Sequence, residues 1–163
     1  VEEPEEPVLD VNELLAGWWK LDEGSGTTAV DGSGNGRSGT LRGGAAWTSG
    51  RVGPAVNFDG VDDRVELPGF SVTGSQLTLA AWVKPTGLGL DPRILAKASG
   101  TATGEVEWAL EIDDDTVNRW GVRVRAGGTT VRVTGGTVAL NQWTHVAGVY
   151  DGTKVRLYAN GVL

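Results

Sequence analysis

The chain has 163 residues, of which 26 are glycine and none is cysteine, and it carries a net charge of -7. This length suits one domain with a single core. The absence of cysteine excludes a disulfide framework and thiol chemistry, and no apolar run approaches the ~20 residues that a membrane helix needs.

The negative charge is concentrated at the N-terminus. Six of the 21 carboxylates fall within residues 1–13, which hold no base, so 15 acidic and 14 basic residues follow. Without a basic excess to displace counterions from phosphates, nucleic acid is not expected as a partner. We interpret residues 1–16 as an acidic, proline-containing linker with a short helical turn, and residues 17–163 as the folded domain.

After Gly17, short segments of alternating apolar and polar residues predict strands separated by glycine-rich turns. Helical periodicity is nearly absent, which favours an all-β fold of two stacked antiparallel sheets. The predicted strands cover residues 18–21, 39–41, 55–58, 64–67, 77–84, 93–97, 106–112, 120–126, 130–134, 143–150 and 154–159.

The segment 77–83 lacks polar alternation, so we expect a central strand that is buried on both faces. Alternation is clearest in 106–112 and 120–126, where Trp108, Leu110 and Val122 are among the residues expected to face the core. The polar residues between them are expected on the outward face, namely Glu105, Glu107, Glu111, Asp113, Arg123, Arg125 and Arg132.

Residues 142–161 predict a β-hairpin with an Asp-Gly turn at 151–152. On its first strand we expect Trp143, Ala147 and Val149 to face the core. On its second strand the expected core residues are Val155, Leu157 and Ala159.

Five segments, taken in order, closely resemble the concanavalin A-like, laminin-G-like jelly-roll family of large secreted bacterial proteins. They are WKLDEGSG (19–26), DGSGNG (31–36), FDGVDD (58–63), LAAWVKP (79–85) and the hairpin 142–161. The resemblance implies a two-sheet antiparallel β-sandwich, or jelly roll, in a secreted or cell-surface protein. Family members usually continue past this hairpin to a motif near Ile-Asp-Glu-Val, so we expect the sheets to lack their C-terminal strands within this sequence.

The resemblance also favours a non-catalytic extracellular binding module. Carbohydrate recognition is the leading hypothesis, on the outward polar platform. An alternative is an adhesion or assembly module whose unfinished sheet is completed by a strand or chain of a partner protein. The residues expected to bind the ligand are Glu105, Glu107, Arg123, Arg125 and Arg132.

Glycoside hydrolysis is a second alternative, because relatives of this fold carry a catalytic Glu-x-Asp-x-x-Glu strand. Here Glu111 and Asp113 match, but Thr116 stands at the second glutamate position. Asp115 would point the same way only if the strand extended that far. Cross-strand ion pairs explain these carboxylates more simply than a pair of catalytic carboxyl groups.

The segment 31–36 has oxygen side chains at alternate positions, like the first half of a calcium loop, but Arg42 stands where an EF-hand would supply a glutamate. In the resembling family this corner often holds one structural calcium. The matching candidates are Asp22, Asp31 and Asn35, and a plain cluster of Asx-Gly turns is the alternative.

Seven tryptophans also raise the hypothesis of sugar stacking. Most are expected in the core, namely Trp47, Trp82, Trp108, Trp120 and Trp143. Trp18 and Trp19 must face opposite ways on a strand. His145 is the single histidine, which excludes a site built from several histidines.

Overall fold

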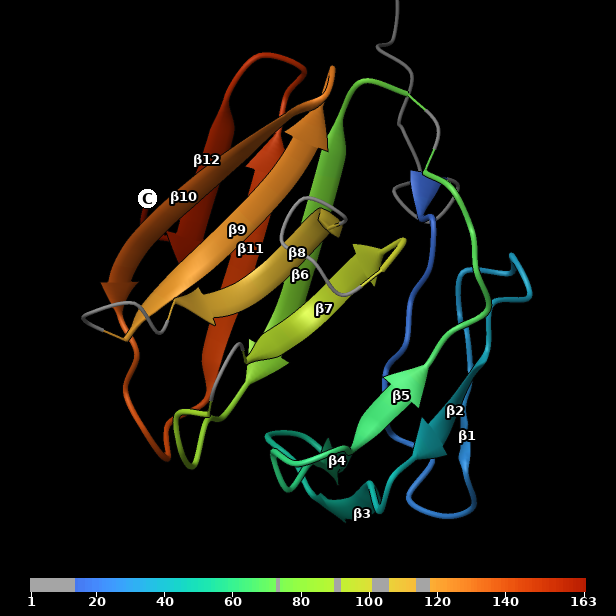
Figure 1. Ribbon diagram of the computed structural model, residues 1–163. Coiled ribbons are helices and arrows are strands. Elements are labelled where there is room, and N and C mark those ends of the chain that lie inside the picture. Colours follow the sequence, from blue (N-terminus) through green and yellow to red (C-terminus); the bar gives the residue numbers. More distant parts are fainter. Residues whose placement is uncertain (1–13, 73, 90–91, 101–105, 114–117) are drawn as a thin grey trace, which may run out of the picture. The chain divides into compact units, whose positions relative to one another are not determined.

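The computed structural model describes residues 14–72, 74–89, 92–100, 106–113 and 118–163 (Figure 1). Contacts within the chain divide it into two compact units, Val1–Val72 and Thr73–Leu163. Both units consist of antiparallel strands, so the prediction of an all-β fold is confirmed. No helix in the described part of the chain is long and apolar enough to cross a membrane.

The N-terminal unit contains a three-stranded sheet of order β1-β2-β5 and the hairpin β3-β4. Its strands are β1 (Thr28–Ala29), β2 (Gly39–Arg42), β3 (Ala46–Ser49), β4 (Pro54–Asn57) and β5 (Arg64–Glu66). β1 and β3 were not predicted. The two residues of β1 are too few to show a period of two.

The strand predicted at 18–21 is wrong. Only an isolated bridge between Trp19 and Asp31 forms there. Leu21 has a φ of 58°, in the left-handed region that an extended strand cannot contain.

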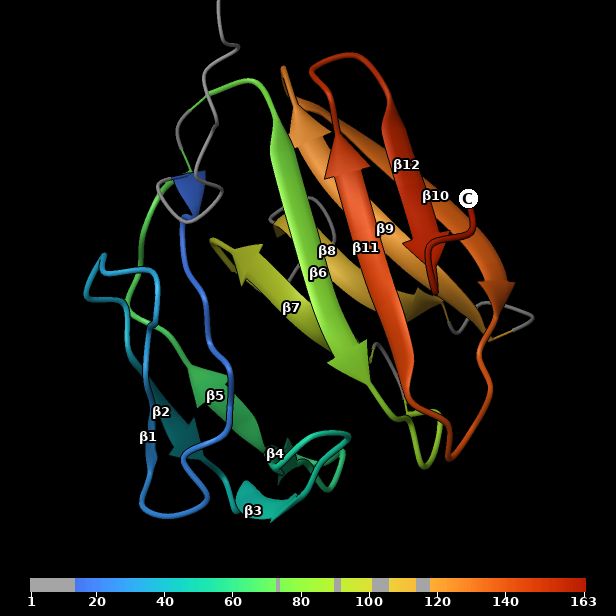
Figure 2. The ribbon, with the colours of Figure 1, turned by 180° about the vertical axis from the view of Figure 1, so that it is seen from behind.

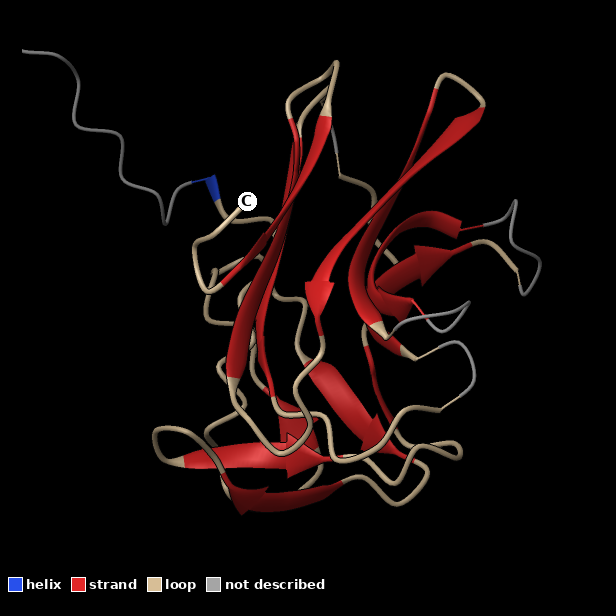
Figure 3. Ribbon diagram, turned by 90° about the vertical axis from the view of Figure 1, so that its left-hand side faces the viewer, coloured by secondary structure: helices blue, strands red, loops and turns tan. Residues whose placement is uncertain are grey.

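The C-terminal unit has two antiparallel sheets that lie face to face, as Figures 1 and 2 show from opposite sides and Figure 3 shows in profile. One has the order β10-β9-β8-β7 and the other β12-β11-β6. Their strands are β6 (Leu77–Val83), β7 (Arg93–Ala98), β8 (Val106–Asp113), β9 (Arg119–Ala126), β10 (Thr129–Thr137), β11 (Thr144–Tyr150) and β12 (Val155–Ala159).

The core of this unit lies between the two sheets. Leu110, Trp120 and Val122 are buried on one side of it and Val146 on the other. Gly148 of β11 lies directly against Val122, because a Cβ built at Gly148 would be only 2.4 Å from Val122 Cγ2. A glycine at this position therefore sets how closely the two sheets can approach.

The predicted inward face of β11 is wrong. Thr144, Val146 and Gly148 are buried, whereas His145 and Ala147 are half-buried on the other side. Both faces of this strand carry small or apolar residues, so the alternation alone did not identify the face that packs on Val122. On β12 Leu157 is buried as predicted, whereas Val155 and Ala159 are half-buried.

The prediction for β6 is also wrong, because this strand lies at the end of its sheet rather than in the centre. Leu79 is buried, but the alternate residues Thr78, Ala80 and Trp82 are exposed. The segment is apolar because alanine and tryptophan occupy its exposed face, and not because both faces are buried in a core. Whether another chain adds strands to these sheets stays a prediction.

Candidate functional site

The candidate site lies on the side of the sheet β10-β9-β8-β7 that faces away from the core. Leu110 and Val122 point into the core, so their neighbours Glu111 and Arg123 point to the opposite side. Arg132 of β10 lies directly across from Arg123. We call this surface the polar face, and its members are Lys97, Glu107, Glu111, Asp113, Arg123, Arg125 and Arg132.

Glu111 is the centre of the polar face. Its side chain is only 2% exposed, and its Oε1 accepts hydrogen bonds from Arg123 Nη2 at 3.1 Å and Arg132 Nε at 2.8 Å. Arg132 also reaches Asp113, with Nη2 3.2 Å from Oδ1. One guanidinium therefore bridges two carboxylates, and we call these four residues the Glu111 cluster.

Gly121 makes room for this cluster. It lies opposite Glu111 on β9, and a Cβ built there would be 3.1 Å from Glu111 Cγ. The glycine thus allows the carboxylate to lie flat against the sheet between the two arginines.

The second oxygen of Glu111 is unusual. Oε2 is buried and has no hydrogen-bond partner among the described residues. A buried acceptor without a donor costs roughly 1–3 kcal/mol relative to a paired one. The cluster therefore favours an additional donor at this position, such as a water molecule or a ligand hydroxyl.

The remaining platform residues are arranged differently from the cluster. Glu107 pairs with Lys97, with Oε2 2.9 Å from Nζ. Arg125 is exposed near the end of β9, opposite Thr130. Glu105 lies outside the described residues. The structure therefore brings Arg123 and Arg132 together, whereas Glu107 belongs to a separate ion pair.

Glu111 itself was absent from the predicted binding set. It was expected on the outward face in a cross-strand ion pair, but its almost complete burial was not expected. Its position on β8, with Arg123 on the neighbouring strand β9 and Arg132 on the next strand β10, is the signal that could have identified it.

Asp31, one of the three predicted calcium ligands, is buried in the N-terminal unit. Its Oδ1 accepts from the backbone N–H groups of Trp18 (3.0 Å) and Ser33 (2.9 Å), and its Oδ2 from that of Arg37 (2.9 Å). Burial by itself raises the pKa of Asp31, but the hydrogen bonds from Ser33, Trp18 and Arg37 outweigh it and hold the pKa below its ordinary value.

The other two predicted ligands have different contacts. Asp22 forms an exposed ion pair with Lys20 at 3.5 Å. The side-chain amide of Asn35 donates to the carbonyl of Leu15 at 2.8 Å and to Ser33 Oγ at 3.1 Å. Among the described residues, no hydrogen bond or ion pair joins Asp22, Asp31 and Asn35, so calcium at these residues stays a prediction.

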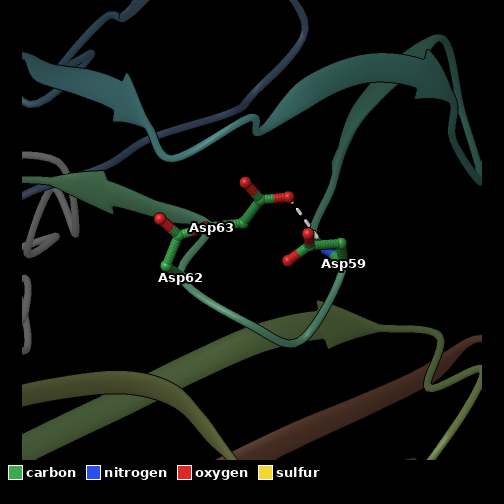
Figure 4. A group of neighbouring side chains, drawn as sticks. All are labelled: Asp59, Asp62 and Asp63. Carbon is green, nitrogen blue, oxygen red and sulfur yellow. Dashed lines mark hydrogen bonds between the residues drawn. The ribbon is translucent and has the colours of Figure 1, made fainter.

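A group of carboxylates that was not predicted could hold a metal ion. Asp59, Asp62 and Asp63 each offer an oxygen, and these atoms lie within 4.8 Å of one another (Figure 4). The backbone N–H of Asp59 donates to Asp63 Oδ2 at 2.8 Å. Asp63 Oδ1 is buried without a hydrogen-bond partner in the described part of the chain. Three aspartates within five residues of a turn were the available signal.

The sequence matches the family model described as the concanavalin A-like lectin/glucanases superfamily over residues 59–163. The chain belongs to this superfamily. The resemblance noted in the sequence is thus confirmed. Among solved structures, the chain is similar to domain 4 of AbnA, a GH43 extracellular arabinanase from Geobacillus stearothermophilus, in complex with arabinotriose.

That similarity has a TM-score of 0.48 and 26% sequence identity, and it covers 81% of this chain. The chain spans 66% of the length of the arabinanase domain. No curated protein matches the sequence.

Proposed function

We propose that this domain is a non-catalytic carbohydrate-binding module of a larger secreted or cell-surface protein, and that its polar face binds the sugar. The observation that carries the proposal is the buried Glu111, with one oxygen bound by two arginines and the other without a donor. A buried ion-pair network adds little stability over apolar packing. Membership in a superfamily of lectins and glucanases supports a sugar as the ligand.

The chemistry of the polar face suits a sugar. Hydroxyl groups both donate and accept hydrogen bonds, and the face offers donors from Arg132 and acceptors from Asp113 and Glu107. These side chains are partly exposed, at 29%, 17% and 43%, so a ligand could reach them. Glu111 would act as a positioning residue that holds the guanidinium of Arg132 in one orientation.

The same contacts support a non-catalytic role. A retaining glycosidase needs one carboxylate as nucleophile and a second carboxyl group as proton donor. Here Glu111 and Asp113 are both ion-paired with Arg132, so neither is positioned as an unpaired nucleophile or acid. The third residue considered for catalysis, Asp115, lies outside the described residues.

A structural calcium ion forms part of the proposal, with Asp59, Asp62 and Asp63 as its ligands. The unpartnered Oδ1 of Asp63 supports this choice over Asp31, whose oxygens already accept three backbone N–H groups. Carboxylate oxygens are the ligands that calcium prefers. When bound, the ion would neutralise the repulsion between the three carboxylates.

A glycan array followed by calorimetry tests the proposal. We expect the domain to bind at least one oligosaccharide, and Arg132→Lys to weaken that binding by about tenfold, or ~1.4 kcal/mol. A lysine cannot contact Glu111 and Asp113 at once as the planar guanidinium does. Arg42→Ala is the matched control, because Arg42 forms an exposed ion pair with Glu66 in the other unit.

Circular dichroism should show that both variants keep the fold. If the folded domain binds no glycan, or if Arg132→Lys binds as tightly as Arg42→Ala, the proposed function is wrong.

A further inference from the structure

A shallow cavity of about 570 Å³, wide open to solvent, lies beside the hairpin β3-β4, and nothing in the proposed function uses it. All of its lining residues belong to the N-terminal unit, so it exists independently of the polar face. They are Gly24, Trp47, Thr48, Ser49, Gly53 and Pro54. Because it is open to solvent, it can cover one face of a ligand but cannot enclose it.

The hairpin that forms this cavity is fixed by its turn. The backbone N–H of Gly50 donates to the carbonyl of Gly53 at 2.7 Å, and β3 pairs with β4 from Ala46 to Ser49. Gly24 completes the wall. Its φ is 70°, and a Cβ built there would lie 3.2 Å from Pro54 Cγ. The walls are therefore preorganised rather than formed by mobile side chains.

Trp47 supplies the aromatic surface. It was expected in the core, but it is half-buried and lines the cavity. Its Nε1–H donates to the carbonyl of Gly26 at 2.8 Å, which satisfies the polar atom of the indole and holds the ring in place. What the ring can offer a ligand is therefore its apolar surface.

The other lining residues define the chemistry of the ligand. None of the six residues is ionisable, so a charged ligand would find no counterion among them. Ser49 lies two residues from Trp47, on the same face of β3, and its exposed hydroxyl group can donate and accept hydrogen bonds. Pro54 adds a second apolar ring. A ligand with one apolar face and a rim of neutral hydroxyls matches this combination.

We propose that this cavity is a second saccharide subsite, in which one neutral sugar ring stacks on Trp47 and hydrogen-bonds to Ser49. It takes the same class of ligand as the polar face but does not depend on that face.

NMR titration with neutral trisaccharides (maltotriose, cellotriose, xylotriose and arabinotriose) at up to about 10 mM, a range suited to millimolar affinity, tests this subsite. We expect at least one of them to shift the indole N–H signal of Trp47 and the backbone signals of Thr48, Ser49 and Gly53. Trp47→Ala should abolish the shifts at the cavity, and Trp47→Phe should weaken binding there by less, since a smaller aromatic ring remains.

Trp18→Ala is the matched control, because Trp18 is an exposed tryptophan of the same unit that does not line the cavity. Signals of Gly121 and Arg132 report the polar face separately, so failure at one site is distinguishable from failure at the other. The subsite is refuted if none of the trisaccharides shifts the cavity signals, if the shifts persist in Trp47→Ala, or if trigalacturonate binds there more tightly than every neutral sugar.

Discussion

Replacing Glu111 by glutamine removes the charge at the centre of the polar face while keeping the shape of the side chain. Oε1 of Glu111 accepts two bonds from guanidinium groups, at 3.1 and 2.8 Å, and its side chain and that of Arg123 are 2% and 8% exposed. The substitution leaves Arg123 buried without its counterion. Because breaking a buried ion pair costs 3–5 kcal/mol and glutamine retains the acceptor, we expect a loss of about 3 kcal/mol.

Two isosteric substitutions on the same face serve as matched controls. Asp113→Asn removes a charge that is 17% exposed and pairs with Arg132 at 3.2 Å, so we expect a loss of about 1 kcal/mol. Glu107→Gln acts on a carboxylate that is 43% exposed, where solvent screens the pair with Lys97, and it should cost less than about 0.5 kcal/mol.

Urea denaturation of the wild type and the three variants, followed by circular dichroism, measures the loss of stability in each variant. In thermal melts, 3 kcal/mol corresponds to a fall in Tm of roughly 12–24 °C for a unit of this size. If Glu111→Gln is no more destabilising than Glu107→Gln, the carboxylate of Glu111 does not hold the two arginines in place, and its proposed positioning role is wrong.

Three further outcomes follow from the structure. Gly148→Ala should destabilise the C-terminal unit by about 1–3 kcal/mol in urea, because the new methyl group would meet the β-branched Val122 at 2.4 Å. Asp31→Asn should lower the stability of the N-terminal unit at neutral pH, where the ionised carboxylate accepts three backbone N–H groups, but make little difference in strong acid. Calcium titration followed by calorimetry should show binding that Asp62→Asn weakens, with little response to magnesium.

Each of these predictions has its own control. For the packing prediction, Gly87→Ala adds a methyl group where no atom lies within 4 Å, so its stability should change by less than about 0.5 kcal/mol. If Gly148→Ala is equally mild, the two sheets do not pack as closely as described. For calcium, Asp22→Asn is the comparison, and equal weakening by both variants would argue against the three-aspartate site.

The pH dependence has a definite sign. Because the folded pKa of Asp31 lies below its ordinary value, its ionised form stabilises the fold above that ordinary value. The contribution is lost as the pH falls toward the folded pKa. Acid titration of the wild type should therefore show a loss of stability in this range that Asp31→Asn lacks, and parallel curves for the two proteins would contradict the role of Asp31.

The sequence alone was sufficient for the family, the all-β class and most strands. β6 to β12 lie close to their predicted segments, since five or more residues of alternation and clear turn signals define a strand. β1 was not predicted, because it has only two residues. A strand was wrongly predicted at 18–21, where Leu21 has a left-handed φ. Such local geometry depends on neighbours that are distant in the sequence.

The candidate site was predictable only in part. Alternation correctly placed Glu111, Arg123 and Arg132 on one side of their sheet, because successive residues of a strand point to opposite faces. It did not show that Glu111 is buried. Burial depends on the register of the sheet, which places Arg123 of β9 beside Glu111 and Arg132 of β10 on the strand after that.

The local order of residues thus determined which side chains share a face of each strand, and the turns that join the strands. Only the tertiary structure decided which face of β11 packs on Val122, and that Glu111 and Arg123 are withdrawn from solvent. The physical reason is that alternation is a property of one strand, whereas burial and ion pairing arise from atoms of several strands brought together by the sheet.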